Sequence, residues 1–210
     1  MNYPRYKKAH MKAVWICILI RFSFSASGQL TDREIYDLKG GRVKQDNSFV
    51  YSLPYSQGKK FLLVQAYNSN KFSHRNELSL DFKMKQGSSI CAAREGIVVE
   101  IKEDSEVGGA KDEYLSQGNH IIILHSDGSR AMYWHLQKDG VLVNAGDTVK
   151  QGQHIGISGN TGYSGFPHLH FQVKDKDGKE LATRFLTRKG IRYLRPGKWY
   201  KAVQEPQTHH

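Results

Sequence analysis

The chain has 210 residues, with 31 Lys and Arg against 20 Asp and Glu and a formal net charge of +11 at pH 7. Five of the basic side chains and none of the acidic ones lie in residues 1–27, so the rest of the chain carries only +6, without any run of five like charges. This distribution excludes nucleic acid as the expected partner and favours weak attraction to the anionic polymers or lipids of a cell envelope.

Residues 1–27 have the pattern of a secretory signal peptide. A basic start precedes an apolar run at residues 13–20, and the small residues Ser25, Ala26 and Ser27 follow. We expect cleavage near Ser27 and a mature protein in the periplasm, the cell envelope or the extracellular space. The apolar run is far shorter than the roughly 20 residues that cross a bilayer as a helix, so we expect no stable membrane span after cleavage. An uncleaved membrane anchor is the alternative interpretation.

The two cysteines predict a mature protein without disulfides. Cys17 lies in the segment expected to be removed, which leaves Cys91 without a partner. Cys91 lies in the small, apolar run "SSICAA", which predicts a buried core residue rather than a catalytic thiol. The roughly 180 residues that follow the signal are enough to bury a core within one domain.

The chain divides into a short lead-in, one domain and a tail. We interpret residues 28–59 as the lead-in, residues 60–180 as the domain, and residues 181–210 as a C-terminal segment packed on the edge of its sheet. From about residue 48 onward, short β-rich runs alternate with turn residues, and nothing long has a sustained helical period. This pattern predicts an all-β fold.

Two connections within the domain carry specific predictions. Asp127-Gly128 separates two β-rich runs and predicts a hairpin turn in which both residues have positive φ. Residues 102–118 are polar and too long for a tight turn. We expect this stretch to form a groove wall or lid, with surface disorder as the alternative.

Two histidines stand two residues apart in the run "GFPHLHFQV" at residues 165–173. Successive side chains of a strand point to opposite faces, so this run predicts a strand with an apolar core face and a second face that holds both imidazoles. Two neutral imidazoles fixed side by side suit a metal site or a pair of proton-transfer groups, with an incidental exposed face as the alternative. The core face would hold Leu169, Phe171 and Val173, and the other face His168, His170 and Gln172.

Other candidate residues lie earlier in the chain. His74 lies in a polar turn, Asp81 in a strand with apolar residues on its other face, and His135 at the end of a strand. Alternation places His135 on the same face as Tyr133 and Ala131. A carboxylate and several imidazoles, with no cysteine ligand at hand, match a zinc site of the His/His/Asp type, whose open fourth position for water suits hydrolysis.

The motifs "SHRNELSLDF", "YWHL" and "GYSGFPHLHF" follow one another in an order that resembles the lysostaphin/LytM-type zinc metallopeptidases over residues 60–174. The resemblance implies a two-sheet β-sandwich built from a duplicated hybrid motif, with the site in a groove. It implies Zn²⁺ held by His74, Asp81 and His170, with His135 and His168 as metal-free catalytic histidines. It further implies an exported endopeptidase that cleaves the peptide cross-links or bridges of peptidoglycan.

Two residues depart from the family pattern. His74 and Asp81 are separated by six residues where the compact pattern has three. Gln172 follows "HLHF" where family members often have Glu, a change beside the ligands that could alter the orientation of a histidine without abolishing metal binding.

The chemistry implied by the resemblance assigns a task to each free histidine. We expect His168 to take a proton from the metal-bound water, and His135 to stabilise the oxyanion or to protonate the leaving amine. The remaining internal histidines are expected to be structural or surface residues; they are His120, His125 and His154.

Two other functions are compatible with parts of the sequence. A non-catalytic LytM-like domain could bind and activate another cell-wall hydrolase, but all five expected positions hold the right residue types. A swinging-arm carrier is suggested by "GDTVKQGQHIG", which is similar to lipoyl and biotinyl domains, with Lys83 or Lys85 as the modified residue. Such a carrier has no use for a His/Asp/His set. The sequence therefore favours the peptidase.

Overall fold

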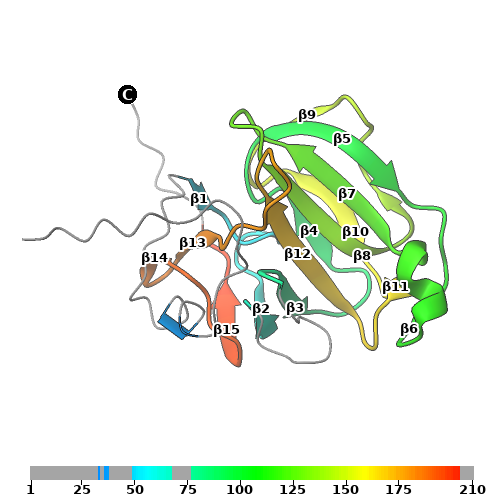
Figure 1. Ribbon diagram of the computed structural model, residues 1–210, viewed down its shortest axis with the longest axis horizontal. Coiled ribbons are helices and arrows are strands. Elements are labelled where there is room, and N and C mark those ends of the chain that lie inside the picture. The colour runs from blue at the N-terminus through cyan, green and yellow to red at the C-terminus, as the bar shows by residue number, and fades with distance from the viewer. Residues whose placement is uncertain (1–32, 34–35, 38–48, 68–76, 204–210) are drawn as a thin grey trace, which may run out of the picture.

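A computed structural model describes residues 33, 36–37, 49–67 and 77–203 of the chain. His74 and the predicted signal segment lie outside these residues. Nearly all the regular structure in the described part is β-strand, as Figure 1 shows. The elements are β1 (Val50–Tyr51), β2 (Lys60–Ala66), β3 (Leu80–Lys83), β4 (Ser89–Cys91), β5 (Gly96–Lys102), β6 (Gly108–Gly109), the 3₁₀-helix η1 (Asp112–Gln117), β7 (Asn119–Leu124), β8 (Arg130–Val141), β9 (Thr148–Val149), β10 (His154–Ser158), β11 (Gly162–Tyr163), β12 (His168–Lys174), β13 (Arg184–Thr187), β14 (Gly190–Arg192) and β15 (Lys198–Lys201).

One large sheet dominates the described residues. Its strands follow the order β15-β2-β3-β12-β8-β7-β5-β9, and β10 pairs with both β8 and β4. The strands β3, β12 and β8 are direct neighbours near the middle of this order, and both pairings are antiparallel. Those three strands carry Asp81, the His-x-His pair and His135, so pairing alone brings the predicted site residues from distant parts of the chain onto adjacent strands.

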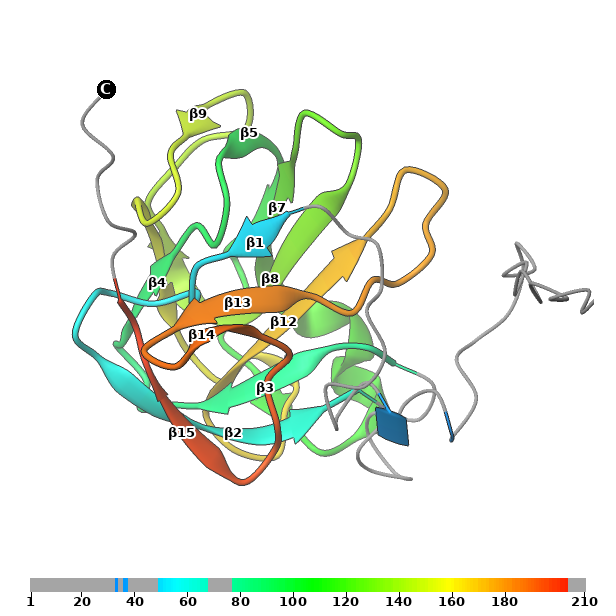
Figure 2. The same ribbon diagram turned by 90° about the vertical axis from the view of Figure 1, so that its left-hand side faces the viewer.

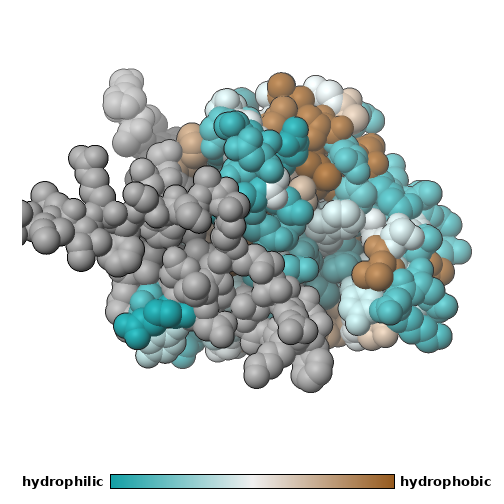
Figure 3. Space-filling view, in the orientation of Figure 1, coloured by the Kyte–Doolittle hydropathy of each residue, from teal (hydrophilic) through white to brown (hydrophobic). Residues whose placement is uncertain are grey.

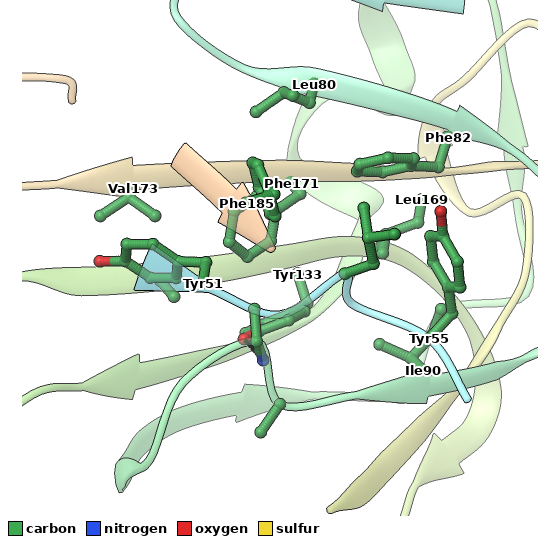
Figure 4. Packing of buried hydrophobic residues seen from close by; sticks show 14 of the residues in the cluster. Tyr51, Tyr55, Leu80, Phe82, Ile90, Tyr133, Leu169, Phe171, Val173 and Phe185 are labelled. Atoms are coloured by element: carbon green, nitrogen blue, oxygen red, sulfur yellow. Dashed lines mark hydrogen bonds between the residues drawn. The ribbon is translucent and has the colours of Figure 1, made fainter. Parts of the chain in front are cut away.

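A smaller sheet of β1, β13 and β14 covers the core face of the large one. Figure 2 shows β13 and β14 crossing in front of β12 and β8. Aromatic rings join the two layers: the ring of Phe171 on β12 lies 5.8 Å from that of Phe185 on β13 and 6.3 Å from that of Tyr51 on β1 (Figure 4). Burial of a side chain as large as Phe171 contributes about 1.5–3 kcal/mol to stability. The expected all-β, two-layer fold is confirmed.

The strand β12 shows the predicted alternation. Its apolar side chains are buried in the core between the two layers. Because alternate side chains point to opposite sides, His168, His170 and Gln172 lie on the other face of the large sheet, which we call the site face. The core side chains are Leu169, Phe171 and Val173.

Residues 102–118 are ordered and pack against the segment that precedes β12; we call them the wall, after their predicted role. They contain β6 and η1, and β6 pairs in parallel with β11. Gly162 on β11 has φ of +78°, and a Cβ atom there would lie 2.6 Å from the Cα of Gly118. The glycine thus permits both the turn and the close approach of the wall to the chain that precedes β12.

The hairpin between β7 and β8 forms at the predicted place. Gly128 has the expected positive φ of 82°, and the amide of His125 donates to the carbonyl of Ser129 at 2.8 Å. Asp127 does not adopt positive φ, contrary to prediction. Its carboxylate instead accepts hydrogen bonds from the amide and hydroxyl of Ser129, which stabilises a turn of a different type.

The surface is mostly polar on the face shown in Figure 3, with apolar residues gathered over the end of the molecule where Figure 1 labels β5 and β9. Ile97 and Val99 of β5 are exposed. No helix of the described residues has the length and apolarity that a membrane crossing would need. Cys91 is a buried free thiol, in agreement with the predicted core position.

Candidate active site

Side chains from β3, β8 and β12 meet on the site face. His135, His168 and His170 each present a nitrogen, and the three atoms all lie within 4.8 Å of one another. Asp81 completes the cluster from β3. Four of the five predicted site residues therefore come together, whereas His74 lies outside the described residues.

Asp81 sits between the two histidines of β12. It pairs directly with His170 across the antiparallel β3–β12 ladder, so both side chains emerge on the same face. Its Oδ1 atom lies 3.0 Å from Nδ1 of His170 and 3.6 Å from Nε2 of His168. The residue is only 3% exposed, and its sequence neighbours Leu80 and Phe82 point into the core. A buried carboxylate is thus held against two imidazoles.

His135 reaches the site because β8 contains a bulge. Asn119 pairs with Leu136 and His120 with Trp134, which leaves His135 as the extra residue between them. Its φ of 68° is left-handed, a conformation uncommon for a residue with a side chain. The predicted strand alternation, which put His135 on the face of Tyr133, is wrong because a bulge of this kind re-aims a side chain. The His135 ring lies 4.7 Å from that of His168.

Backbone carbonyls set the tautomers of both predicted catalytic histidines. Nδ1 of His135 lies 2.7 Å from the carbonyl oxygen of Thr161, and Nδ1 of His168 lies 2.8 Å from that of Phe166. A carbonyl oxygen only accepts, so each neutral ring carries its proton on Nδ1 and has a lone pair on Nε2. Both carbonyls belong to the segment between β10 and β12, which therefore orients both histidines.

The cluster shifts the pKa values of its histidines in opposite directions. Burial, together with the neighbouring His168 and His170, lowers the pKa of His135 to about 3. Burial also disfavours the charged form of His170, but the hydrogen bond and negative charge of Asp81 outweigh it and raise the pKa of His170. His135 is therefore neutral at physiological pH, whereas the Asp81 carboxylate stabilises the protonated form of His170.

The donors present fit a zinc ion. Neutral imidazole nitrogens and a carboxylate oxygen are ligands that zinc accepts, and protein ligands bind it at about 2.0–2.2 Å. Two ligand atoms at that distance from one tetrahedral centre lie roughly 3.3 Å apart. The Asp81 Oδ1 to His170 Nδ1 distance of 3.0 Å is close to this value.

Two residues near the site were assigned no function from the sequence. Trp134 pairs with His170 on one side and with His120 on the other, and the rings of Trp134 and His120 lie 4.2 Å apart. His120 is held by Glu100, whose carboxylate lies 2.9 Å from Nε2. Ser164 places its hydroxyl 3.2 Å from Nδ1 of His168. The alternation of side chains along β8 could have predicted that Trp134 lies on the site face. Ser164 lies outside the strands, so no alternation pattern in the sequence points to it.

Gln172 connects β12 to the segment that precedes β3. Its side-chain amide donates to one carboxylate oxygen of Glu180 at 2.8 Å, and the other oxygen of Glu180 accepts from the backbone amide of Leu78 at 2.5 Å. The glutamine found where the family often has Glu thus donates to a carboxylate, which a Glu side chain could do only when protonated.

The fold and the cluster together define a class: an all-β protein with a histidine–aspartate constellation of the kind that hydrolytic metal sites use. The sequence model of Peptidase family M23 matches residues 75–182, more than half of the chain. The chain belongs to Peptidase family M23, and the resemblance to lysostaphin/LytM-type enzymes is confirmed.

Several named relatives match this region. An uncharacterised metalloprotease of Buchnera aphidicola is 34% identical over 135 residues, which is 60% of this chain and 33% of that protein. Lysostaphin of Staphylococcus simulans is 46% identical over 94 residues, covering 44% of this chain and 17% of lysostaphin. The peptidoglycan DD-endopeptidase ShyA of Vibrio cholerae is 34% identical over 93 residues, covering 44% and 19%. The chain thus spans a third or less of these relatives.

A solved structure supports the fold. The deep-sea M23 metalloprotease pseudoalterin has a TM-score of 0.50 with this chain at 20% sequence identity, covering 76% of this chain and 98% of that one. At this level of identity the likeness concerns the fold, and it agrees with the layered β architecture described above.

Proposed function

We propose that this chain is an exported zinc metalloendopeptidase that hydrolyses peptide bonds in the cross-links or bridges of peptidoglycan. His74, Asp81 and His170 would hold the zinc ion, and residues 60–180 would form the catalytic domain. The observation that carries the proposal is the contact of Asp81 Oδ1 with His170 Nδ1 at 3.0 Å, beside two further histidines whose tautomers are fixed. Membership of the M23 family and the peptidoglycan DD-endopeptidase activity named for ShyA support it.

When bound, zinc would polarise the scissile carbonyl and lower the pKa of its water ligand to about 7. The chain's own residues then have to move a proton. His168 is the better base, because its Nε2 has a lone pair and lies 3.6 Å from the Asp81 carboxylate, which stabilises the imidazolium that forms. The protonated Nε2 of His168 can afterwards donate to the leaving amine.

His135 has a different role in this proposal. The low pKa of His135, about 3, disfavours its imidazolium form. Its Nδ1–H donates to the carbonyl of Thr161, so its Nε2 acts as a hydrogen-bond acceptor. An acceptor fixed at this point would orient the attacking water or the amide N–H of the substrate. The two histidines therefore divide into a proton carrier and an orienting group.

The test is hydrolysis of purified cell walls of defined chemistry by the purified protein. We expect new amine ends, identified by mass spectrometry, at one class of peptide bond, and loss of this activity on chelation with recovery when zinc is returned. Tight binding to the walls without new amine ends from the zinc-loaded protein would contradict the proposal. That result would support the non-catalytic, hydrolase-activating role instead.

A further inference from the structure

A cavity of about 830 Å³ lies next to the candidate active site and outside the residues proposed for catalysis. Among the described residues, its lining includes four lysines, Lys59, Lys60, Lys83 and Lys85, and no acidic side chain. Its apolar lining includes Leu62 of β2 and Trp199 of β15, together with Met84, which follows β3. The cavity thus combines apolar walls with a cationic rim.

Strand register places this cavity on the site face. Trp199 pairs with Leu62, Leu62 pairs with Lys83, and Lys83 pairs with His168. Paired residues on neighbouring strands share a face, so these four side chains form one row across β15, β2, β3 and β12. Pro167, directly before His168, also lines the cavity. A substrate held at His168 would therefore extend into the cavity along the sheet.

The four lysines form no ion pair with any described residue, unlike several other lysines in the molecule. Lys138 pairs with Glu106, Lys111 with Glu113, and Lys176 with Asp177. The ammonium group of Lys60 instead lies 5.4 Å from the centre of the Trp199 ring, which lines the cavity, and that of Lys83 lies 5.9 Å from the centre of the Phe166 ring. Four like charges around one hollow repel one another and favour an anion between them.

We propose that this lysine pocket binds a carboxylate of the peptide substrate, at a residue that flanks the scissile bond. The proposal rests on the proposed function. The carboxylate lies among the lysine ammonium groups, and the apolar part of the same residue packs on Leu62 and Trp199, whose side chain is 58% exposed. The alternative anion, a phosphate of a wall polymer, fits less well, because the pocket adjoins the candidate active site: Pro167, directly before His168, lines it.

The test compares two forms of a cross-linked peptide, one with a free carboxylate beside the scissile bond and one with a carboxamide in its place. The comparison is made separately for the residue on each side of the scissile bond. The double variant Lys59→Gln/Lys85→Gln removes two charges, neither of them on a residue paired with His168. We expect its preference for the carboxylate peptide, measured as the ratio of kcat/KM values, to fall about tenfold, through KM. Lys150→Gln is the control, because this exposed lysine follows β9 at the opposite end of the sheet.

The outcomes separate the two proposals. A ratio that is unchanged in the double variant, or an equal loss of activity towards both peptides, overturns the lysine pocket. So does a variant that loses only its binding to a phosphate polymer. If the zinc-loaded parent cleaves neither peptide, the peptidase proposal fails, and the pocket is then tested by equilibrium binding of the same two peptides. Tighter binding of the carboxylate form, lost in the double variant, supports the pocket; equal binding of both forms overturns it.

Discussion

Asp81 and His170 face each other across the β3–β12 ladder, with Oδ1 of the aspartate 3.0 Å from Nδ1 of the histidine. The two residues lie 89 positions apart in the chain. A metal bound by both would link the two strands, so its binding free energy would add to the stability of the fold.

Metal removal should therefore lower the melting temperature. A ligand that binds only the folded state at 100 times its Kd contributes about 2.7 kcal/mol. We expect chelation to lower the melting temperature of the parent protein by several degrees, and zinc to restore it. Asp81→Asn keeps the size of the side chain but removes the charge, and its melting temperature should respond little to zinc. An equal zinc response of parent and variant would contradict a role for Asp81 as a ligand.

Because His135 has a left-handed backbone, two different substitutions can test its catalytic role and its conformational role separately. Among residues with a side chain, Asn is one of those that best tolerate positive φ, whereas a β-branched residue there is strained by about 1–3 kcal/mol. We expect His135→Asn to fold with near-parent stability but to lose about 10²- to 10⁴-fold in kcat, as removal of a positioned catalytic group does. His135→Val should lose stability as well. Urea unfolding and initial rates check both; near-parent activity in His135→Asn would show that the ring is not needed.

A substitution at Gly162 tests whether the position of the wall formed by residues 102–118 matters for activity. Gly162→Ala combines a positive φ with a Cβ atom 2.6 Å from Gly118, whereas Gly58→Ala has a similar φ of +79° and open space around the Cβ. Both variants share a backbone cost of about 1–2 kcal/mol. We expect only Gly162→Ala to lose activity as well, because the displaced wall disturbs Thr161 and with it His135. Matched activity losses in the two variants would contradict this role.

His125 should make the fold sensitive to acid at a point remote from the site. Burial lowers the pKa of His125 below its ordinary value of 6.5, although the hydrogen bond with the carbonyl of Glu95 opposes the shift. The unfolded chain therefore binds a proton at higher pH than the folded chain. Stability is complete above about pH 6.5 and falls as the pH drops towards the lowered pKa, by at most about 1.4 kcal/mol per pH unit.

The variant His125→Asn removes this titration while keeping a side-chain N–H donor. Its free energy of unfolding, measured in urea between pH 5 and pH 7.5, should fall less steeply with acid than that of the parent. His154→Asn is the control, because this histidine is exposed to solvent. A variant slope equal to that of the parent would show that His125 titrates alike in the folded and unfolded states.

The strand β12 could be read almost residue by residue from the sequence, because alternation is a local property and its core face is uniformly apolar. The bulge at His135 could not, since it is defined by the pairing of Asn119 and His120 with β8 rather than by local residue types. The hydrogen bonds to the carbonyl groups of Thr161 and Phe166 could not be predicted either, because every residue has a backbone carbonyl whatever its side chain.

The lysine pocket shows the same limit. Lys59 and Lys60 are more than twenty positions from Lys83 and Lys85, and the β2–β3 register brings them together. From the sequence, Lys83 and Lys85 were candidates only for the modified lysine of a carrier domain. Pairing between strands, rather than residue type, decided which charges became neighbours.

Zinc content in single alanine variants tests the central claim most directly. We predict about one zinc per chain, by elemental analysis, in His168→Ala and His135→Ala, both with activity reduced about 10²- to 10⁴-fold, and little zinc in His170→Ala and His74→Ala. The two histidines of β12 would then have separate tasks, one in metal binding and one in proton transfer. Zinc lost from His168→Ala but retained in His170→Ala would show that these two tasks are assigned the wrong way round.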